Sequence, residues 1–329
     1  MEYRSLGQSG LQVSCLGLGG NIFGHFCDAY ATSTIIHEAC DLGINFIDTA
    51  DVYSEGLSEE FIGSAVRNRR SRWIIATKLG VRSGESPAKK GRKESILRRA
   101  EESLRRLKTD YIDLYQMHHF DPGTPLEETL EALHLLVREG KVRHIGASNY
   151  SSEQLRRALQ LARAFNWTPF LSTQNHYNLL KRDIESDVLC LCREAQISLV
   201  VYGALARGVL SGKYRFGQKP PPESRASMSA SIDADLTADV LQTVGDLTAF
   251  ARRRGKTVGK LALAWILRRS EVATIVIGVR NVMHLKDNVD AVNWELSESE
   301  IDEIGGIVGD LKKFQSVSLG SFPISSQMP

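Results

Sequence analysis

The sequence of residues 45–53 is NFIDTADVY, in which an apolar run is followed by a carboxylate and then by a phenol. Phe46 and Ile47 have the character of a buried strand, and Asp48 ends the run. Tyr53 follows in the loop after it. Because a positioned phenol can donate a proton to a reacting group, this stretch predicts a strand end that carries acid chemistry.

Seven more short apolar runs repeat this pattern along the chain. Each of the eight is long enough for a buried strand of a parallel sheet. They are Leu16–Leu18, Asn45–Asp48, Trp73–Thr77, Tyr111–Met117, Val142–Ser148, Phe170–Gln174, Ser198–Tyr202 and Thr274–Ile277.

Helical periodicity separates these runs, for example across residues 96–107 and 155–165. Capping-box spacings at residues 151–154 and 297–300 mark two helix starts. Strand and helix alternating eight times predicts an α/β fold, the (β/α)8 TIM barrel, as a single domain over residues 1–329. A doubly wound sheet is the second choice.

Several segments stand outside this alternation. Residues 2–6 and 11–14 flank a turn and predict a short N-terminal β-hairpin. Residues 211–233 contain several glycines and prolines without periodicity, so we expect a lid. An extra helix is expected at about 238–253, near the C-terminus. The C-terminal tail, residues 311–329, is expected to be flexible or to cover the pocket.

The composition favours small-molecule chemistry. A formal net charge of +2 gives no field suited to nucleic acid or to an acidic membrane. The five cysteines form no Cys-x-x-Cys pair, and no apolar run reaches the ~20 residues of a membrane span. We therefore expect a cytoplasmic protein with a small-molecule partner, as a monomer or a weak homo-oligomer.

One run of charged residues could indicate a basic patch. Residues 89–108 are rich in Lys and Arg, yet Glu94, Glu101 and Glu102 interrupt them on a periodic helix. We therefore interpret this run as the solvated face of a helix.

Four titratable residues fall at the ends of three consecutive predicted strands: Asp48, Tyr53, Lys78 and His118. In a barrel, such positions share one rim. Lys78 would stabilise the Tyr53 phenolate and lower the pKa of Tyr53, while Asp48 would hold Lys78. His118 would orient the substrate oxygen or assist proton transfer. A phenol tuned in this way needs a hydride source to complete a carbonyl reduction.

Together these motifs resemble the signature of the aldo-keto reductase superfamily, in its bacterial NADPH-dependent type. The matching segments are DTADVY (48–53), ATK (76–78), DLYQMH (113–118), GKVRHIGASN (140–149), QNHYNLL (174–180), YGALARG (202–208) and IGVR (277–280). The resemblance implies an oxidoreductase that interconverts a carbonyl and an alcohol, with Tyr53 as general acid and NADP(H) as cofactor.

The resemblance also implies the cofactor residues. Ser148, Asn149 and Gln174 match positions that bind the nicotinamide carboxamide, and Tyr202 matches the ring that stacks on it. The pyrophosphate would lie under Gly203, Leu205, Arg207, Gly208, Ser211 and Lys213. The adenosine phosphate and adenine would contact Gly278, Arg280, His284, Asp287 and Asn288. Because His284 replaces the Arg or Gln of many relatives, NAD(H) stays as the second choice.

The substrate pocket would include Asn21 and His119. His119 stands where Trp or Arg is common in the family. Adjacent residues of a strand point to opposite faces, so His118 and His119 are not expected to share a metal ion, and we expect no metal site. Residues 17–20, GLGG, lack the third glycine of a dinucleotide-binding fingerprint and predict a glycine-rich loop after the first barrel strand.

Two other functions are consistent with these residues. Some relatives of this fold bind NADP(H) and serve as regulatory subunits of membrane channels, with little turnover. A barrel isomerase or lyase could use Lys78 as a Schiff base. The complete set of Asp48, Tyr53, Lys78 and His118 favours the reductase, because a pure binding module has no need of a tuned phenol.

Overall fold

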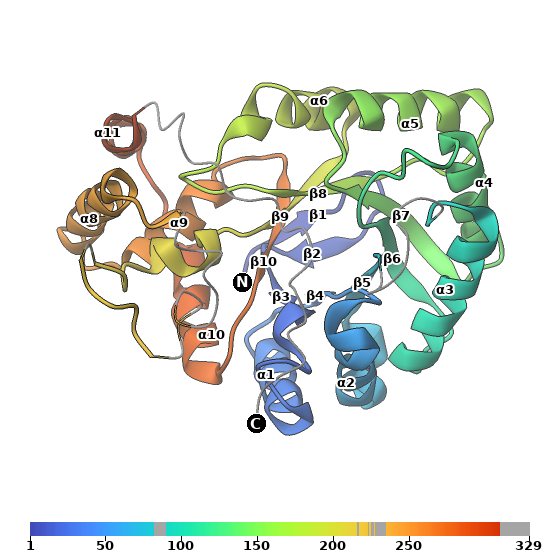
Figure 1. The fold of residues 1–329 in the computed structure, drawn as a ribbon, viewed down its shortest axis with the longest axis horizontal. Helices are drawn as coiled ribbons and strands as arrows, with labels where there is room; N and C mark the ends of the chain where they lie inside the picture. The colour runs from blue at the N-terminus through green and yellow to red at the C-terminus, as the bar shows by residue number, and fades with distance from the viewer. Residues whose placement is uncertain (82–89, 216, 223, 225–226, 228–234, 310–329) are drawn as a thin grey trace.

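The computed structural model describes residues 1–81, 90–215, 217–222, 224, 227 and 235–309. Its centre is a closed parallel barrel with the strand order β10-β3-β4-β5-β6-β7-β8-β9 (Figure 1). The strands are β3 (Leu16–Gly19), β4 (Phe46–Asp48), β5 (Ile74–Leu79), β6 (Ile112–Met117), β7 (Val142–Ser148), β8 (Ser172–His176), β9 (Ser198–Tyr202) and β10 (Val272–Ile277). All eight predicted strands are present, so the predicted (β/α)8 barrel is confirmed.

Helices surround the barrel on its outside (Figure 1). They are α1 (Ala29–Asp41), α2 (Leu57–Val66), α3 (Lys93–Leu107), α4 (Leu126–Arg138), α5 (Ser152–Ala164), α6 (Val188–Ala195), α9 (Val258–Leu267) and α10 (Val282–Val289). The extra helix predicted near the C-terminus is α8 (Ala238–Arg252), and it is joined there by α11 (Glu298–Val308). Both predicted capping boxes are formed, at Ser151 and Ser297.

The N-terminal hairpin closes one end of the barrel. Strands β1 (Tyr3–Ser5) and β2 (Gln12–Ser14) pair antiparallel, as predicted. Leu6 and Val13 are fully buried in a cluster with Phe46, Leu114 and Val200 from the barrel strands. Because β2 leads directly into the start of β3, the hairpin covers the N-terminal end of the barrel, and the opposite end carries the long loops.

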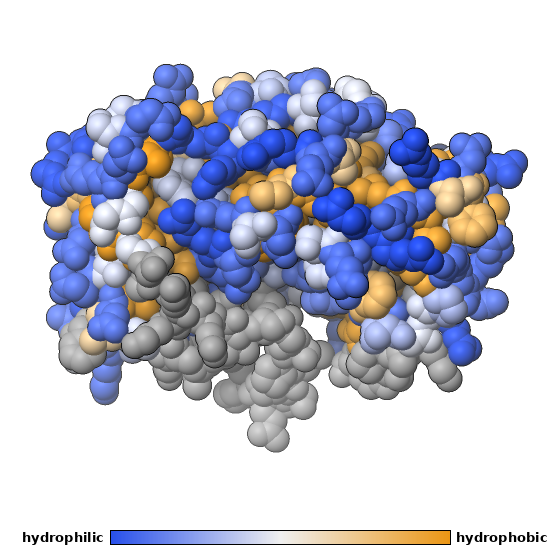
Figure 2. All heavy atoms as spheres, turned by 90° about the horizontal axis from the view of Figure 1, so that it is seen from above, coloured by the Kyte–Doolittle hydropathy of each residue, from blue (hydrophilic) through white to orange (hydrophobic). Residues whose placement is uncertain are grey.

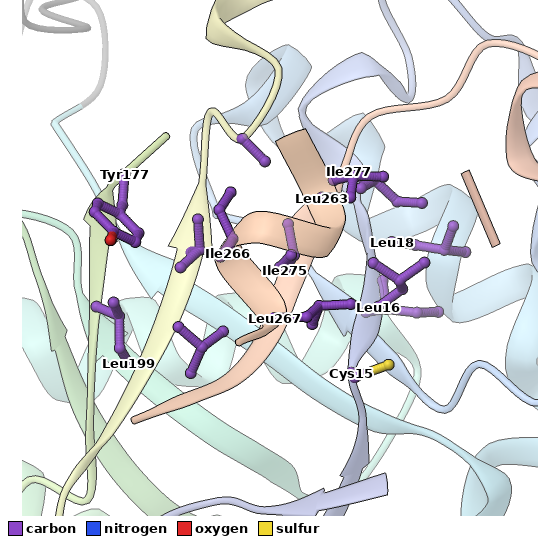
Figure 3. Close-up of a cluster of buried hydrophobic side chains, with 14 of the residues drawn as sticks. Cys15, Leu16, Leu18, Tyr177, Leu199, Leu263, Ile266, Leu267, Ile275 and Ile277 are labelled. Carbon is purple, nitrogen blue, oxygen red and sulfur yellow. The ribbon is translucent and has the colours of Figure 1, made fainter. Parts of the chain in front are cut away.

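A second apolar layer packs the barrel against its helices. In Figure 3, Leu16 and Leu18 of β3 and Ile275 of β10 lie beside Leu263 and Ile266 of α9. These side chains point outward from the barrel and are buried by α9, which is apolar and buried along most of its length. The face seen in Figure 2 is mainly hydrophilic, with apolar atoms lying between the polar side chains.

The glycines of residues 17–20 lie mostly within β3, so the prediction of a loop after that strand is wrong. A Cβ on Gly17 would come within 2.7 Å of Phe46 Cδ1. Gly17 therefore lets β3 pack closely against the Phe46 ring. Only Gly20 leaves the strand, at the start of the short helix η1 (Gly20–Ile22).

The interpretation of residues 89–108 as a purely solvated helix face is also wrong. The Arg99 side chain is 1% exposed and donates from Nε to Asp51 Oδ2 at 2.6 Å. Arg106 donates to the fully buried Glu59 at 2.7 Å. The inner face of α3 thus carries two guanidinium groups because two buried carboxylates on the neighbouring segment require them.

Two predicted segments lie wholly or partly outside the described residues. The tail at 311–329 is one, and residues 216, 223, 225–226 and 228–233 of the expected lid at 211–233 are the other. Within the described residues, no helix combines the length and apolarity needed to cross a bilayer.

Replacing Arg99 by Met should destabilise the fold strongly. Asp51 would keep its bond from Gly80 N, at 2.9 Å, but would lose its guanidinium partner in a buried site. Breaking one side of a buried ion pair costs about 3 kcal/mol or more of unfolding free energy. The measurement is urea-induced unfolding followed by circular dichroism.

The neighbouring Arg98 supplies a matched control. Its side chain is 56% exposed and pairs with Glu102 on the helix surface. Because such surface pairs contribute little, Arg98→Met should cost less than about 0.5 kcal/mol. Equal losses for the two variants would contradict a special role for the buried pair.

Candidate active site

The site is built around a buried lysine at the end of β5. Lys78 Nζ lies 2.5 Å from Asp48 Oδ2, 2.9 Å from the Thr49 carbonyl oxygen and 3.4 Å from the Tyr53 hydroxyl. Its side chain is 0% exposed. The predicted hydrogen bond between Asp48 and Lys78 is therefore present. Adjacent parallel strands deliver these groups, since β4 pairs with β5 through Asp48 and Ala76.

Electrostatics keep the lysine charged and the phenol protonated. Burial alone would lower the pKa of Lys78, but Asp48 and Tyr53 outweigh it and raise that pKa. Burial raises the pKa of Tyr53, and the attraction of Lys78 opposes this only in part. The expected net lowering of the Tyr53 pKa is thus wrong, because desolvation of the phenol disfavours the phenolate more than one ammonium favours it.

The backbone after Tyr53 is strained. Ser54 and Glu55 have left-handed φ angles of 49° and 57°, and Gly56 follows with 97°. Such angles cost non-glycine residues about 1 kcal/mol or more each. The Ser54 hydroxyl donates to the Phe23 carbonyl oxygen at 2.9 Å and holds this turn against the preceding loop. Strain held in this way fixes the direction of the phenol.

His118 lies directly after β6 and faces the phenol. Its ring contacts the Tyr53 ring edge to face, with 5.8 Å between centroids. The backbone is fixed from both sides, because His118 N donates to the Leu79 carbonyl oxygen and Asn149 Nδ2 donates to the His118 carbonyl oxygen. Burial and then the Lys78 charge hold the pKa of His118 well below its ordinary value. The imidazole is therefore neutral at neutral pH.

His118 and His119 do not point to opposite faces. Their rings stack with 5.1 Å between centroids and 8° between planes. The expected alternation fails because β6 ends at Met117, so the strand geometry no longer applies. Burial and the Lys90 charge lower the pKa of His119 to about 4.

A chain of hydrogen bonds links Asp48 to strands β7, β8 and β9 in the second half of the barrel. Gln174 Nε2 donates to Asp48 Oδ1 at 2.7 Å, and the Ser148 hydroxyl donates to the Gln174 carbonyl oxygen at 3.0 Å. Asn149 Nδ2 donates to Ser148 Oγ at 3.0 Å, and the Tyr202 hydroxyl donates to Asn149 Oδ1 at 2.7 Å. The four residues expected at the nicotinamide are thus brought together.

Tyr202 has a stacking partner that the sequence analysis missed. The His176 ring lies 5.2 Å from the Tyr202 ring, with 20° between the planes. A cavity of about 220 Å³ lies beside them and is lined also by Lys181 and Asp183. Burial and the nearby charges of Lys181 and Arg207 lower the pKa of His176 to about 4.

The residues expected at the pyrophosphate lie on the loop after β9 and on η5 (Ala206–Ser211). Ala206, Arg207 and Gly208 have left-handed φ angles of 47°, 57° and 99° in succession. Ser211 Oγ donates to the Gly208 carbonyl oxygen at 2.6 Å, which closes the turn. Three other expected residues flank η5. Gly203 and Leu205 precede it, and Gly203 has a left-handed φ of 70°. Lys213 follows it.

The residues expected at the adenosine end lie after β10. Gly278 and Arg280 precede α10, and the Arg280 guanidinium lies 4.1 Å from the centre of the Phe26 ring. The other three are on the helix, whose N-cap Asn281 accepts from His284 N. Asp287 pairs with Lys260 of α9 at 2.9 Å, and Asn288 follows it.

Asn21, expected in the substrate pocket, lies on η1 after β3 and is exposed. It therefore occupies the same end of the barrel as the other loops that follow the strands.

Helical spacing could have found the missed residue Arg99. The buried face of α3 includes Ile96, Ala100 and Ser103, and Arg99 lies on that face by its three- and four-residue spacing. No sequence signal distinguishes His176, whose position depends on how β8 and β9 pair.

The fold is a (β/α)8 barrel with a buried Asp48–Lys78 ion pair in contact with Tyr53 at the C-terminal end of its strands. A family model described as the Aldo/keto reductase family matches residues 15–308. The chain therefore belongs to the aldo/keto reductase family, whose members are oxidoreductases of carbonyl compounds.

Individual relatives match along most of their length. The chain is 33% identical over 302 residues to a probable voltage-gated potassium channel subunit beta of Arabidopsis thaliana, with 89% of this chain and 92% of the relative covered. It is 33% identical over 317 residues to the aldo-keto reductase YhdN of Bacillus subtilis, with 94% of each covered. It is 34% identical over 339 residues to the aldo-keto reductase AMT2 of Alternaria alternata, with 91% and 89% covered.

The partly buried, neutral His176 should make stability depend on pH. Its pKa in the folded protein, about 4, is below the ordinary value near ~6.5, so the unfolded chain binds an additional proton between these values. The unfolding free energy should therefore fall as the pH is lowered from about 6.5 toward 4.

Urea unfolding across that range measures the effect. The His176→Gln variant should lose less stability on acidification than the wild-type protein, because it lacks one proton-binding group of the unfolded state. Identical pH slopes for the two proteins would contradict a neutral, partly buried His176.

Proposed function

We propose that this protein is an NADP(H)-dependent reductase that converts an aldehyde or ketone to an alcohol, or catalyses the reverse reaction. The observation that carries the proposal is the buried cluster in which Lys78 contacts both Asp48 and Tyr53 beneath His118. Bound NADPH would supply the hydride. In this proposal Tyr53 and His118 act on the oxygen of the carbonyl, and Asp48 holds Lys78 beside the phenol.

Tyr53 is the proton donor in this proposal. The phenol retains its proton at neutral pH, as a general acid must. When negative charge develops on the substrate oxygen, Tyr53 gives up its proton, and the nearby Lys78 ammonium stabilises the phenolate that forms. Neutral His118 can donate a hydrogen bond to the same oxygen.

The residues present fit a nicotinamide dinucleotide. The hydroxyl of Ser148 and the amides of Asn149 and Gln174 provide the donors and acceptors that a carboxamide needs. Tyr202 offers an aromatic face beside the 220 Å³ cavity. Gly208, with its left-handed φ, lets the backbone of the following loop approach a pyrophosphate.

Cationic side chains at the adenosine end favour NADP(H) over NAD(H). Arg280 is held over the Phe26 ring, and a guanidinium is suited to bind a phosphate group. All five cysteines are free, which agrees with a reducing cytoplasm. We propose that the protein acts there on a small molecule, as a monomer or a weak homo-oligomer.

Replacing Tyr53 by Phe should abolish carbonyl reduction while NADPH binding persists. Loss of a general acid reduces kcat by about 10²–10⁴-fold, and the Phe ring keeps the packing against His118. The measurement is the loss of NADPH absorbance in the near ultraviolet with a panel of aldehydes. Binding of NADPH is followed separately by its fluorescence.

A second variant tests the charge beside the phenol. Lys78→Met should lower kcat similarly, because the phenolate loses its stabilising charge and Asp48 is left unpaired. Wild-type turnover in Tyr53→Phe would remove Tyr53 from the mechanism.

Arg280→Met should change the choice of cofactor. Without the guanidinium, kcat/KM for NADPH should fall by about tenfold or more, whereas kcat/KM for NADH should change little, because NADH has no 2′-phosphate. Lys286→Met is the control, since Lys286 lies on α10, the helix that follows Arg280, and pairs with Glu38 at 2.7 Å. A parallel loss with both cofactors in Arg280→Met would contradict this role.

A second candidate function is an NADP(H)-binding regulatory subunit of a membrane channel. It is favoured by the similarity to the Arabidopsis thaliana protein named as a probable potassium channel subunit beta. Tight NADPH binding with no turnover of any carbonyl, together with a stable protein partner, would favour this function over the reductase.

A further inference from the structure

The loop that follows β3 holds Arg280 in the loop that follows β10. The two strands are neighbours in the barrel, with Leu18 opposite Ile277, so the loops after them leave the same end. The Arg280 guanidinium carbon lies 4.1 Å from the centre of the Phe26 ring. The Cys27 thiol donates to the Arg280 carbonyl oxygen at 3.8 Å. Both the side chain and the backbone of Arg280 are therefore contacted by the loop after β3.

Residues 22–27, which we call the 22–27 loop, are closed by their own hydrogen bonds. The Ile22 carbonyl oxygen accepts from Phe26 N at 2.8 Å and from Cys27 N at 3.1 Å, and Gly24 N donates to the Cys27 carbonyl oxygen at 2.8 Å. Ile22 and Cys27 are each 2% exposed, and the partly buried Phe26 packs against the same core. The loop therefore presents the Phe26 ring in a fixed position.

The 22–27 loop is also packed against the turn after Tyr53. The Ser54 hydroxyl donates to the Phe23 carbonyl oxygen at 2.9 Å. Gly24 has a left-handed φ of 82°, and a Cβ on it would come within 2.8 Å of Ser54 Cβ and 3.0 Å of Leu57 Cβ. The segment that carries Phe26 is thus held between the proton-donor turn and the loop after β10.

The contact between Phe26 and Arg280 is of a kind that suits a phosphate site. An aromatic ring attracts a guanidinium through its π-electrons. This attraction orients the guanidinium without adding a carboxylate, which would repel a phosphate and accept the N–H donors that the phosphate needs. A side chain that is already oriented loses less conformational entropy when it binds.

We propose that Phe26 is a positioning residue that orients Arg280 toward the 2′-phosphate of NADP(H), and that Phe26 thereby sets the preference for NADP(H) over NAD(H). This inference rests on the proposed NADP(H)-dependent function. Phe26 acts through Arg280 in this role. The ring of His25 contacts the Phe26 ring nearly at right angles, with 4.3 Å between centroids, and supports it from within the 22–27 loop.

The test measures the binding of two dinucleotides that differ only in the 2′-phosphate. The Kd values of NADPH and NADH are obtained from the fluorescence of the bound dinucleotides, so no turnover is needed. The preference ratio is the Kd of NADH divided by the Kd of NADPH. Phe26→Leu should lower this ratio by about three- to tenfold, with the Kd of NADH little changed. Phe26→Tyr keeps an aromatic ring and should retain most of the ratio.

Tyr30→Leu is the matched control. Tyr30 is an aromatic residue four positions further along, at the start of α1, and it is 82% exposed. Its replacement removes a ring of similar size from the same part of the chain. The preference ratio of Tyr30→Leu should equal that of the wild-type protein.

A double variant shows whether Phe26 acts through Arg280. Arg280→Met alone should lower the preference ratio. Adding Phe26→Leu to Arg280→Met should lower it no further, because the ring then has no guanidinium to orient. Two independent contributions would instead multiply.

Four results would overturn the inference. They are an unchanged ratio in Phe26→Leu, a further fall in the double variant, a wild-type ratio near one, and an equal rise in both Kd values in Phe26→Leu. The last result would give the ring a general structural role. Absence of binding of either dinucleotide to the wild-type protein is a separate outcome, because it would refute the proposed NADP(H)-dependent function itself.

Discussion

The ion pair between Lys78 and Asp48 is the interaction on which the site depends. Burying both charges is costly, and it is tolerated only because their remaining polar atoms are bonded. Lys78 also donates to the Thr49 carbonyl oxygen, and Asp48 accepts from Gln174 across the barrel. These bonds need strands β4, β5 and β8 at one level, so the closed barrel and the ion pair require each other.

Asp48 therefore joins the two halves of the barrel at one carboxylate. One oxygen accepts from Lys78, which contacts the phenol of Tyr53. The other accepts from Gln174, whose backbone carbonyl holds the Ser148 hydroxyl. The group that would deliver a proton and the groups that would hold a nicotinamide are thus rigidly connected. Because no flexible segment separates these groups, their relative positions are fixed, as a preorganised site requires.

The sequence predicted the strands well because a buried parallel strand must be apolar, and it predicted Asp48 and Lys78 because strand ends share one rim. What it missed depends on tertiary context. Arg99 looked like a surface charge because its partner Asp51 is distant in the chain. The net pKa direction of Tyr53 depends on how far the folded chain desolvates the phenol, which residue types do not encode. The strand-end positions of Asp48 and Lys78 could therefore be predicted, whereas the stacking of His176 on Tyr202 and the balance of charge and burial at Tyr53 could not.

The surroundings of His118 explain why its imidazole is neutral beside the phenol of Tyr53. Protonating it would place a second charge near Lys78, in a buried site where repulsion is poorly screened. A neutral imidazole avoids this repulsion and still offers one N–H donor and one acceptor. If His118 were charged, it would compete with Lys78 for the developing phenolate and hold Tyr53 in its deprotonated form. Burial is thus the largest cause of the low His118 pKa, and the Lys78 charge, which also opposes the rise of the Tyr53 pKa, adds to it.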